Sequence, residues 1–222
     1  MSDNVKKEIE KSLFGFTTYV LPVISKFELL GGEIITIEDM TIGDNRDVFW
    51  PMFDMFSCVD AWQIETKKKY VRAISNRVQW GSNDWKSFTI RKGRASGADT
   101  EYQKLKRYLE EGDKLCPHLM IQSYITAENN GRLLSLGIAK VADIIRGIDD
   151  GWVLRTMINP KDKTKFDPIF WKRLVKEGRW FRGYCSRLCK QCGCFYDVIR
   201  IQDRVVRADC NCAKQSTAQI AR

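Results

Sequence analysis

Six of the eight cysteines of this 222-residue chain lie in the segment 185–212. Their spacing is Cys-x3-Cys-x2-Cys-x-Cys, followed after fifteen intervening residues by Cys-x-Cys. No other feature constrains the fold of the chain as strongly, because thiols crowded in this way form disulfides, bind a metal, or act as reactive groups. Each of the three alternatives implies a different environment and a different role for the protein.

The choice among these alternatives depends on the cellular compartment. The N-terminal stretch MSDNVKKEIEKSL has no apolar signal-peptide core, and no segment reaches the roughly 18 uninterrupted apolar residues of a membrane span. We therefore expect an intracellular protein, cytoplasmic or associated with a nucleoid or nucleus, and no membrane partner. Intracellular thiols are kept reduced, which disfavours disulfides. Cys58 and Cys116 stand alone in apolar surroundings and are predicted to be buried as small hydrophobic side chains.

The most informative part of the cysteine pattern is Cys189-Lys-Gln-Cys192-Gly193. Two thiolates three residues apart can bind one metal ion from a tight turn, and the glycine that follows lets the backbone turn without a Cβ clash. The next stretch, 195–207, is rich in β-branched and aromatic residues and is interrupted at Gln202-Asp203, which predicts a β-hairpin. Such a hairpin would return the last two cysteines to the first group.

This arrangement resembles a zinc ribbon over residues 185–214. The resemblance implies a structural Zn²⁺ with four thiolate ligands and no open position for a substrate. Ribbons usually close with a second Cys-x-x-Cys, which this chain lacks, so the ligand set is ambiguous. The preferred set is Cys189, Cys192, Cys210 and Cys212, with Cys185 and Cys194 as substitutes. An iron–sulfur cluster is the alternative metal centre, and redox thiols are disfavoured because nothing here resembles a thioredoxin-like unit.

The net charge of +9 is concentrated in the same part of the chain. Residues 161–222 contain 15 Lys and Arg against six Asp and Glu, whereas residues 1–160 contain 22 of each sign. A basic segment of this kind is typical of proteins that contact nucleic acid phosphates, and we favour DNA over RNA as the partner. A protein partner, such as a polymerase, is the alternative. The residues expected to contact nucleic acid are Lys172, Arg173, Lys176, Arg179, Arg182, Arg187 and Lys190.

The sequence periodicity predicts an α/β (α+β) domain over residues 1–160, with a mixed sheet flanked by helices, followed over 161–222 by a basic segment with the small zinc-ribbon-like module. The clearest helix begins at Asp99-Thr100 and stops at Gly112. Helices are also expected at 5–13, 22–30, 141–148 and 167–178, and strands at 33–37, 53–65, 70–81, 85–93, 118–126, 133–139 and 152–158. No glycine-rich phosphate loop follows a strand, which disfavours a nucleotide-hydrolysing core.

Three oxygen-bearing side chains stand at intervals in the first domain: Glu28 in a predicted helix, Asp60 in a predicted strand and Gln79 in the next strand. With the helix and strand that follow, this run resembles the core of the PD-(D/E)XK nucleases over about residues 20–140. The resemblance implies that Asp60, Gln79 and Glu28 hold a Mg²⁺ ion that activates water. The residue two positions after Gln79 is glycine rather than the lysine of the family, and Lys92 on a neighbouring strand is the substitute.

Two functions therefore remain open. One is a Mg²⁺-dependent, PD-(D/E)XK-like nuclease whose zinc module grips DNA, and the other is a non-enzymatic protein that binds nucleic acid or a polymerase. The chain has a single histidine, His118, which disfavours mechanisms built on paired histidines and leaves carboxylates, Gln and Lys for catalysis. The two functions differ in one geometric expectation: in a nuclease, Asp60 and Gln79 converge on one ion.

Overall fold

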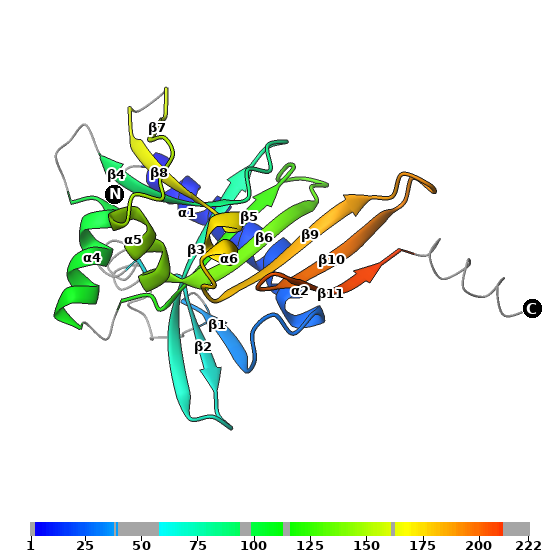
Figure 1. Cartoon of the computed structure of the whole chain (residues 1–222), viewed down its shortest axis with the longest axis horizontal. Helices are drawn as coiled ribbons and strands as arrows, with labels where there is room; N and C mark the ends of the chain where they lie inside the picture. Colours follow the sequence, from blue (N-terminus) through cyan, green and yellow to red (C-terminus); the bar gives the residue numbers. More distant parts are fainter. Residues whose placement is uncertain are drawn as a thin grey trace, which may run out of the picture.

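The structure, a computed structural model, describes residues 3–37, 39, 58–93, 99–112, 116–160 and 163–210. The protein has an eight-stranded mixed sheet and a three-stranded sheet together with a few helices, which confirms the predicted α+β fold class. Figure 1 shows the large sheet running through the molecule, with helices on both of its faces. Within the described ranges, no helix is long and apolar enough to cross a membrane.

The first described segment is a continuous helical stretch with three parts. Helix α1 (Asp3–Gly15) passes into a π-helical turn, η1 (Phe16–Val20), and then into α2 (Leu21–Lys26). The side chains of Phe16, Val20 and Ile24 are buried, and their spacing of four residues places them on one face of the stretch. This face packs against the large sheet.

The predicted helix over 22–30 is too long, because α2 ends at Lys26. Glu28 adopts the left-handed conformation with a φ of 50°, and the backbone N–H of Leu29 donates to the carbonyl of Ile24 at 3.0 Å. This pattern is that of a Schellman-type helix end, in which a left-handed residue satisfies the last free carbonyls. Glu28 therefore lies in a turn rather than on a helix.

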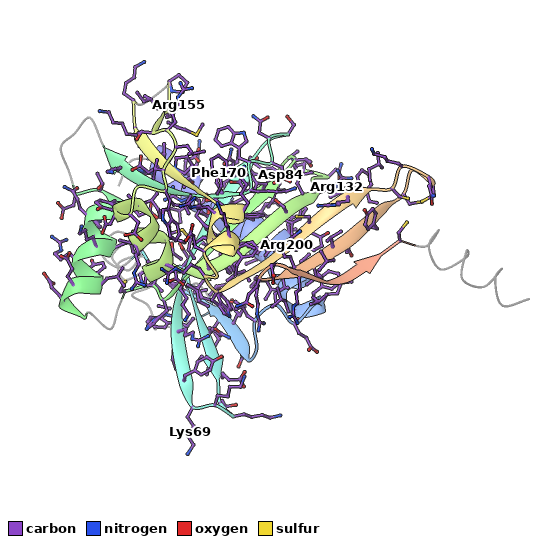
Figure 2. The ribbon with its side chains drawn as sticks, in the orientation of Figure 1. Lys69, Asp84, Arg132, Arg155, Phe170 and Arg200 are labelled. Carbon is purple, nitrogen blue, oxygen red and sulfur yellow. The ribbon has the colours of Figure 1, made fainter. Side chains whose placement is uncertain are left out.

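The eight strands of the large sheet follow the order β1-β2-β3-β5-β6-β9-β10-β11. All neighbours are antiparallel except β3 and β5, which are parallel and are joined by a connection that contains β4 and α4. The β2–β3 hairpin projects from the body of the molecule, with Lys69 at its end (Figure 2). The strands are β1 (Glu33–Thr36), β2 (Ala61–Glu65), β3 (Tyr70–Trp80), β5 (Leu119–Ile125), β6 (Leu133–Lys140), β9 (Phe181–Leu188), β10 (Phe195–Ile201) and β11 (Arg204–Asp209).

The small sheet and three helices cover the other face of the large sheet. Its strands are β4 (Ser87–Gly93), β8 (Lys165–Phe170) and β7 (Met157–Ile158), in that spatial order, and the helices are α4 (Glu101–Glu111), α5 (Val141–Asp149) and α6 (Trp171–Lys176). The side chain of Thr100 and that of Gln103 form a reciprocal capping box at the start of α4. Gly112 ends this helix in the left-handed conformation, so both predicted ends of this helix are confirmed.

The large sheet separates two apolar cores. One lies between the sheet and the N-terminal helical stretch, where Ile74, Ile121 and Leu136 are fully buried. The other lies between the sheet and the layer of α4, α5, α6 and β4, and contains Tyr124 and Trp171. Alternate residues of each central strand contribute to opposite cores, as the pleat requires. The central strands are therefore buried on both faces, which explains their nearly continuous apolar sequence.

A glycine pair fixes the position of Trp171 over the sheet. Gly137 on β6 is the register partner of Gly183 on β9, and a Cβ on Gly137 would lie 2.5 Å from Cε2 of the Trp171 indole. The indole therefore rests directly on the backbone of β6, and its ring also contacts that of Phe181, with centroids 5.6 Å apart. Because this contact spans β6 and β9, it fastens the last three strands to the rest of the sheet.

Two predictions of local structure in this layer were wrong. The helix expected to begin at residue 167 begins at Trp171, and Asp167-Pro168 lie in β8, paired with β4. Pro168 is tolerated there because it lies beyond the two residues of β8 that pair with β7, so no ladder bond is lost on that side. The strand expected over 152–158 is limited to Met157–Ile158.

Other predictions were confirmed. The hairpin over 195–207 consists of β10 and β11, and Gln202 in its two-residue turn has a φ of 54°. Cys116 is buried as expected, but the same prediction was wrong for Cys58, which is half-buried. The division at residue 160 stays a prediction. Strands from both sides of it pair in both sheets, since β6 pairs with β9 and β4 with β8.

Candidate metal centre

Cys189 and Cys192 lie in the loop between β9 and β10. Leu188 and Phe195 are the last register partners of the two strands, so residues 189–194 form the loop. The backbone N–H of Cys189 donates to the carbonyl of Cys194 at 2.8 Å, and that of Gly193 donates to the carbonyl of Cys189 at 2.9 Å. Gly193 has a φ of 69°, a left-handed conformation that glycine adopts without a Cβ clash. The loop is therefore a tight turn of the kind expected for two thiols that share an ion.

Cys210 returns to this loop through the β10–β11 hairpin. Asp209 at the end of β11 is the register partner of Asp197 near the start of β10, and Cys210 follows directly. Antiparallel pairing therefore brings Cys210 to the beginning of β10, next to the loop. The interruption at Gln202-Asp203 sets the length of the hairpin and thereby the position of this cysteine.

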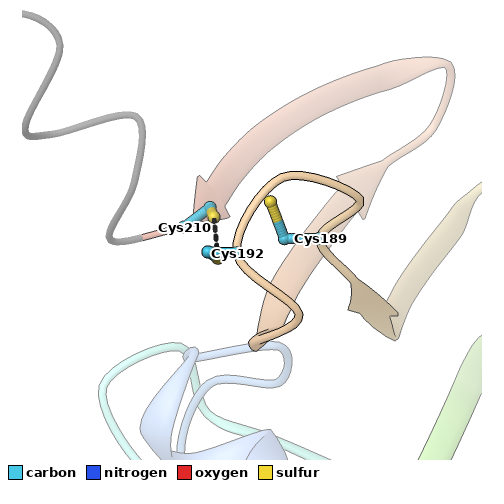
Figure 3. A group of neighbouring side chains, drawn as sticks. All are labelled: Cys189, Cys192 and Cys210. Carbon is cyan, nitrogen blue, oxygen red and sulfur yellow. Dashed lines mark hydrogen bonds between the residues drawn. The ribbon is translucent and has the colours of Figure 1, made fainter.

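The Sγ atoms of Cys189, Cys192 and Cys210 lie within 4.8 Å of one another (Figure 3). The sulfurs of Cys192 and Cys210 are 3.9 Å apart. Two sulfurs bound at about 2.3 Å to one tetrahedral ion lie about 3.8 Å apart, so the observed separation suits a shared ion and is far longer than a disulfide bond of about 2.05 Å. These three cysteines are close enough to hold a metal ion.

The other cysteines of the segment stand differently. Cys185 lies on β9, and burial raises the pKa of its thiol although Lys86, Arg187 and Arg200 nearby favour the thiolate. It is absent from the sulfur cluster found among the described residues. The Sγ of Cys194 donates to the carbonyl of Cys192 at 3.7 Å, so it faces the backbone of the loop. Cys212 lies outside the described residues.

Two exposed basic side chains lie at the cysteine loop. Lys190 lies within it, and Arg187 is exposed on β9. Neither forms a salt bridge with any described residue. Arg200 and Lys86 approach the same part of β9 closely enough to act on the Cys185 thiol. Sequence reasoning did not select Arg200 or Lys86, because only the strand register brings them to β9.

The other residues predicted to contact nucleic acid lie nearer the core, and three of the arginines have structural partners. Arg173 pairs with Glu177 at 3.0 Å, Arg179 approaches Asp143 at 3.8 Å, and Arg182 donates to the carbonyl of Leu29 at 2.6 Å. Lys172 and Lys176 are exposed, and Nζ of Lys172 lies 5.9 Å from the centre of the Phe170 ring. Arg182 thus ties β9 to the turn after α2, a role that its charge alone did not reveal.

The structure does not bring the predicted nuclease residues together. Oδ2 of Asp60 accepts a hydrogen bond from the backbone N–H of Asn76 at 2.5 Å. Gln79 lies three residues farther along β3, about 10 Å at roughly 3.3 Å per residue. Two oxygen ligands of one Mg²⁺ lie about 4 Å apart at most when each is bound at about 2.1 Å.

The two remaining residues of this constellation lie elsewhere. Lys92 on β4 is in the small sheet, where its Nζ pairs with the buried Asp167 at 2.9 Å. Glu28 lies in the turn after α2, where its backbone carbonyl accepts a weak hydrogen bond from Arg182 at 3.4 Å. Among the described residues, the three cysteines are the group of metal-ligating side chains that converges.

No protein family model, no curated protein and no solved structure matches this chain.

Proposed function

We propose that the chain is a non-enzymatic nucleic-acid-binding protein, in which a structural zinc ion holds a basic corner of the large sheet in shape. The observation that carries the proposal is the convergence of Cys189, Cys192 and Cys210 at the end of the β9–β10–β11 strands. Thiolate ligands favour zinc among the common metal ions, and Cys212 is the predicted fourth ligand.

The charge of this corner supports nucleic acid as the partner. Four thiolates and one Zn²⁺ carry a net charge of about −2, whereas the net charge of residues 161–222 is positive by nine. Lys190 and Arg187 flank the loop without a salt bridge to any described residue, so their charges remain available to phosphates. A zinc ion would fix the loop that presents them, since the loop has few apolar contacts of its own: Leu188 and Phe195 at its base are more than half exposed.

We prefer the non-enzymatic function because two of the side chains predicted for a nuclease site already have partners within the fold. Asp60 caps the backbone of Asn76, and Lys92 is paired with Asp167. A side chain already held in a hydrogen bond or ion pair is a poor metal ligand or water-orienting group, because the new role must first break the existing contact.

The test compares the affinity of the zinc-loaded chain for a short, fluorescently labelled DNA duplex with that of two matched variants. Cys192→Ala removes a sulfur of the cluster, and Cys185→Ala removes a cysteine outside it. We expect wild-type binding to weaken steeply with salt, Cys192→Ala to weaken binding at every salt concentration, and Cys185→Ala to retain it. Equal affinities of wild type and Cys192→Ala, or no binding by wild type, would overturn the proposal.

A Mg²⁺-dependent, PD-(D/E)XK-like nuclease is the second candidate, and one observation favours it. The order of a helical stretch, three antiparallel strands β1-β2-β3, a helix α4 and a strand β5 parallel to β3 is the element order of that core. The inserted strand β4 departs from it. Cleavage of DNA that requires Mg²⁺ and is lost in Asp60→Ala, with binding retained, would favour this candidate; cleavage that survives the substitution would remove Asp60 from the mechanism.

A further inference from the structure

The β2–β3 hairpin is a second basic surface, and the order of the strands places it far along the sheet from the cysteine loop at residues 189–194. Its strands pair as far as Glu65 and Tyr70, and residues 66–69 form the turn. The backbone N–H of Lys69 donates to the carbonyl of Thr66 at 3.3 Å, and Lys69 has a φ of 53°. The turn is therefore closed and tight. It projects from the body of the molecule in Figure 2, where Lys69 marks its end.

The base of the hairpin is held on both edges. Strand β1 pairs with β2 from Ala61 to Ile64, and β5 pairs with β3 from Ile74 onward. The pair Glu65–Tyr70 and the turn that follows extend past β1 as a short two-stranded tip. A ribbon supported in this way keeps its register, and hence the direction of its side chains, without contacts at its tip.

The tip carries positive charge without matching acidic partners. Lys67, Lys68 and Lys69 are exposed, and none of them forms a salt bridge with any described residue. Glu65 is the nearest acidic residue along the strand, but its Oε2 is turned toward Gly31, where it would lie 2.6 Å from a Cβ. Glu33, which opposes Ile64 from β1, is the other acidic residue near the base.

Arg72 lies on β3 behind the tip, opposite Gln63, and its guanidinium is held by an aromatic ring. The guanidinium of Arg72 lies over the Tyr70 ring, 4.3 Å from its centre. The Tyr70 hydroxyl accepts a hydrogen bond of 3.4 Å from Gln63, whose side chain also donates to the carbonyl of Gly31 at 2.6 Å. These hydrogen bonds hold the Tyr70 ring in place, and the ring in turn orients the guanidinium of Arg72. A guanidinium held in one plane suits a bidentate contact with phosphate or a guanine edge.

We propose that the β2–β3 hairpin enters the major groove of B-form DNA, with the three lysines on the phosphates at its rim and Arg72 directed toward the base edges. The proposal deepens the proposed function and rests on it. The major groove is about 12 Å wide and admits a two-stranded β-ribbon, whereas the major groove of A-form RNA is too narrow and deep for side chains to read. The shape of the hairpin therefore selects DNA over double-stranded RNA.

The test uses two variants that each remove three lysine charges from the zinc-loaded chain. Lys67→Gln/Lys68→Gln/Lys69→Gln changes the tip, and Lys7→Gln/Lys163→Gln/Lys165→Gln changes exposed lysines elsewhere. Affinity for a DNA duplex, for an RNA duplex of equal length and for vesicles that contain phosphatidylserine is measured over a series of salt concentrations. For DNA, we expect the tip variant to reduce the slope of log Kd against log salt by about 3, one for each lysine. The control variant should change it less, and the tip variant should leave the affinity for RNA unchanged.

Four outcomes would overturn the proposal. If wild type binds DNA and the two variants have equal slopes, the hairpin does not contact the duplex, although the proposed function stands. If the tip variant loses affinity equally for DNA and RNA, the tip binds polyanions without entering a groove. If the tip variant loses binding only to vesicles that contain phosphatidylserine, the partner is a membrane surface. If wild type binds no nucleic acid, the proposed function fails together with the hairpin.

Discussion

The contact between Gly137 and the indole of Trp171 predicts that Gly137→Ala destabilises the protein through a clash. A Cβ at Gly137 would lie 2.5 Å from Cε2, 2.7 Å from Cζ2 and 2.8 Å from Nε1 of Trp171. Contacts under 3.0 Å force a displacement, and the indole has little room because it also meets the rings of Phe88, Tyr124 and Phe181, with centroids 5.6 to 6.0 Å away. Overpacking of a filled core costs about 1–3 kcal/mol.

For a chain of this size, 1 kcal/mol shifts the melting temperature by roughly 2–4 °C, so the expected decrease is about 2–12 °C. The control is Gly93→Ala, where a new Cβ would meet only the flexible side chain of Lys165 at 3.3 Å. The assay is urea unfolding followed by circular dichroism, supported by thermal melts. The free energy of unfolding should be lower for Gly137→Ala than for Gly93→Ala.

A double-mutant cycle isolates the contact itself. Trp171→Phe removes the indole atoms nearest to Gly137, so Gly137→Ala should cost less in that background, with a coupling energy of about 1–2 kcal/mol. The same unfolding assay measures all four proteins. Additive effects, or a Gly137→Ala variant as stable as wild type, would refute the placement of the indole on β6. The attachment of the last three strands would then rest on the pairing of β6 with β9 alone.

Three further predictions concern charged and titrating groups. The Tyr184 hydroxyl donates to Asp197 at 2.8 Å, and burial together with this carboxylate raises the pKa of Tyr184. The contribution of the protonated hydroxyl to stability is complete below about pH 10 and is lost above it. In urea titrations, the stability difference between wild type and Tyr184→Phe should therefore shrink as the pH rises past 10. Partial desolvation and the charge of Arg72 lower the pKa of His118. The contribution of the neutral imidazole to stability is present above about pH 6.5 and is lost as the pH falls. An NMR titration of this histidine with a midpoint at or above 6.5 would contradict the reasoning. Lys92→Met leaves the side chain of the buried Asp167 with its hydrogen bond from Thr156, and should lower the free energy of unfolding by about 1–3 kcal/mol. The matched variant Lys86→Met breaks a partly exposed pair with Asp84 and should cost below about 1 kcal/mol. Equal costs would argue against a structural role for Lys92.

Local signals in the sequence predicted those parts of the structure that depend on neighbouring residues. The polar start at Thr100 and the glycine at Gly112 delimit α4 because capping is settled within one helical turn. The break at Gln202-Asp203 predicted the β10–β11 hairpin, because a two-residue turn between apolar runs is also a local feature. The convergence of Cys189, Cys192 and Cys210 follows from that hairpin.

Features that depend on distant partners could not be predicted in this way. Asp167-Pro168 has the composition of a helix start, but the pairing of β8 with β4, some 80 residues earlier in the chain, makes it a strand. The basic side chain of Arg182 gave no sign that it would bond to the carbonyl of Leu29, a contact between segments remote in sequence. Asp60 and Gln79 were separated by the register of β2 and β3, which the alternation of apolar residues did not specify.

The proposed shape of the cysteine loop depends most on a bound metal ion. Native mass spectrometry of the intact chain, purified without added chelator, measures bound metal and mass together. We predict about one zinc ion for each wild-type and Cys185→Ala chain and none for Cys192→Ala. A folded wild-type chain that carries no metal, or one whose mass shows the cysteines joined as disulfides, would contradict the central claim that Cys189, Cys192 and Cys210 share one ion.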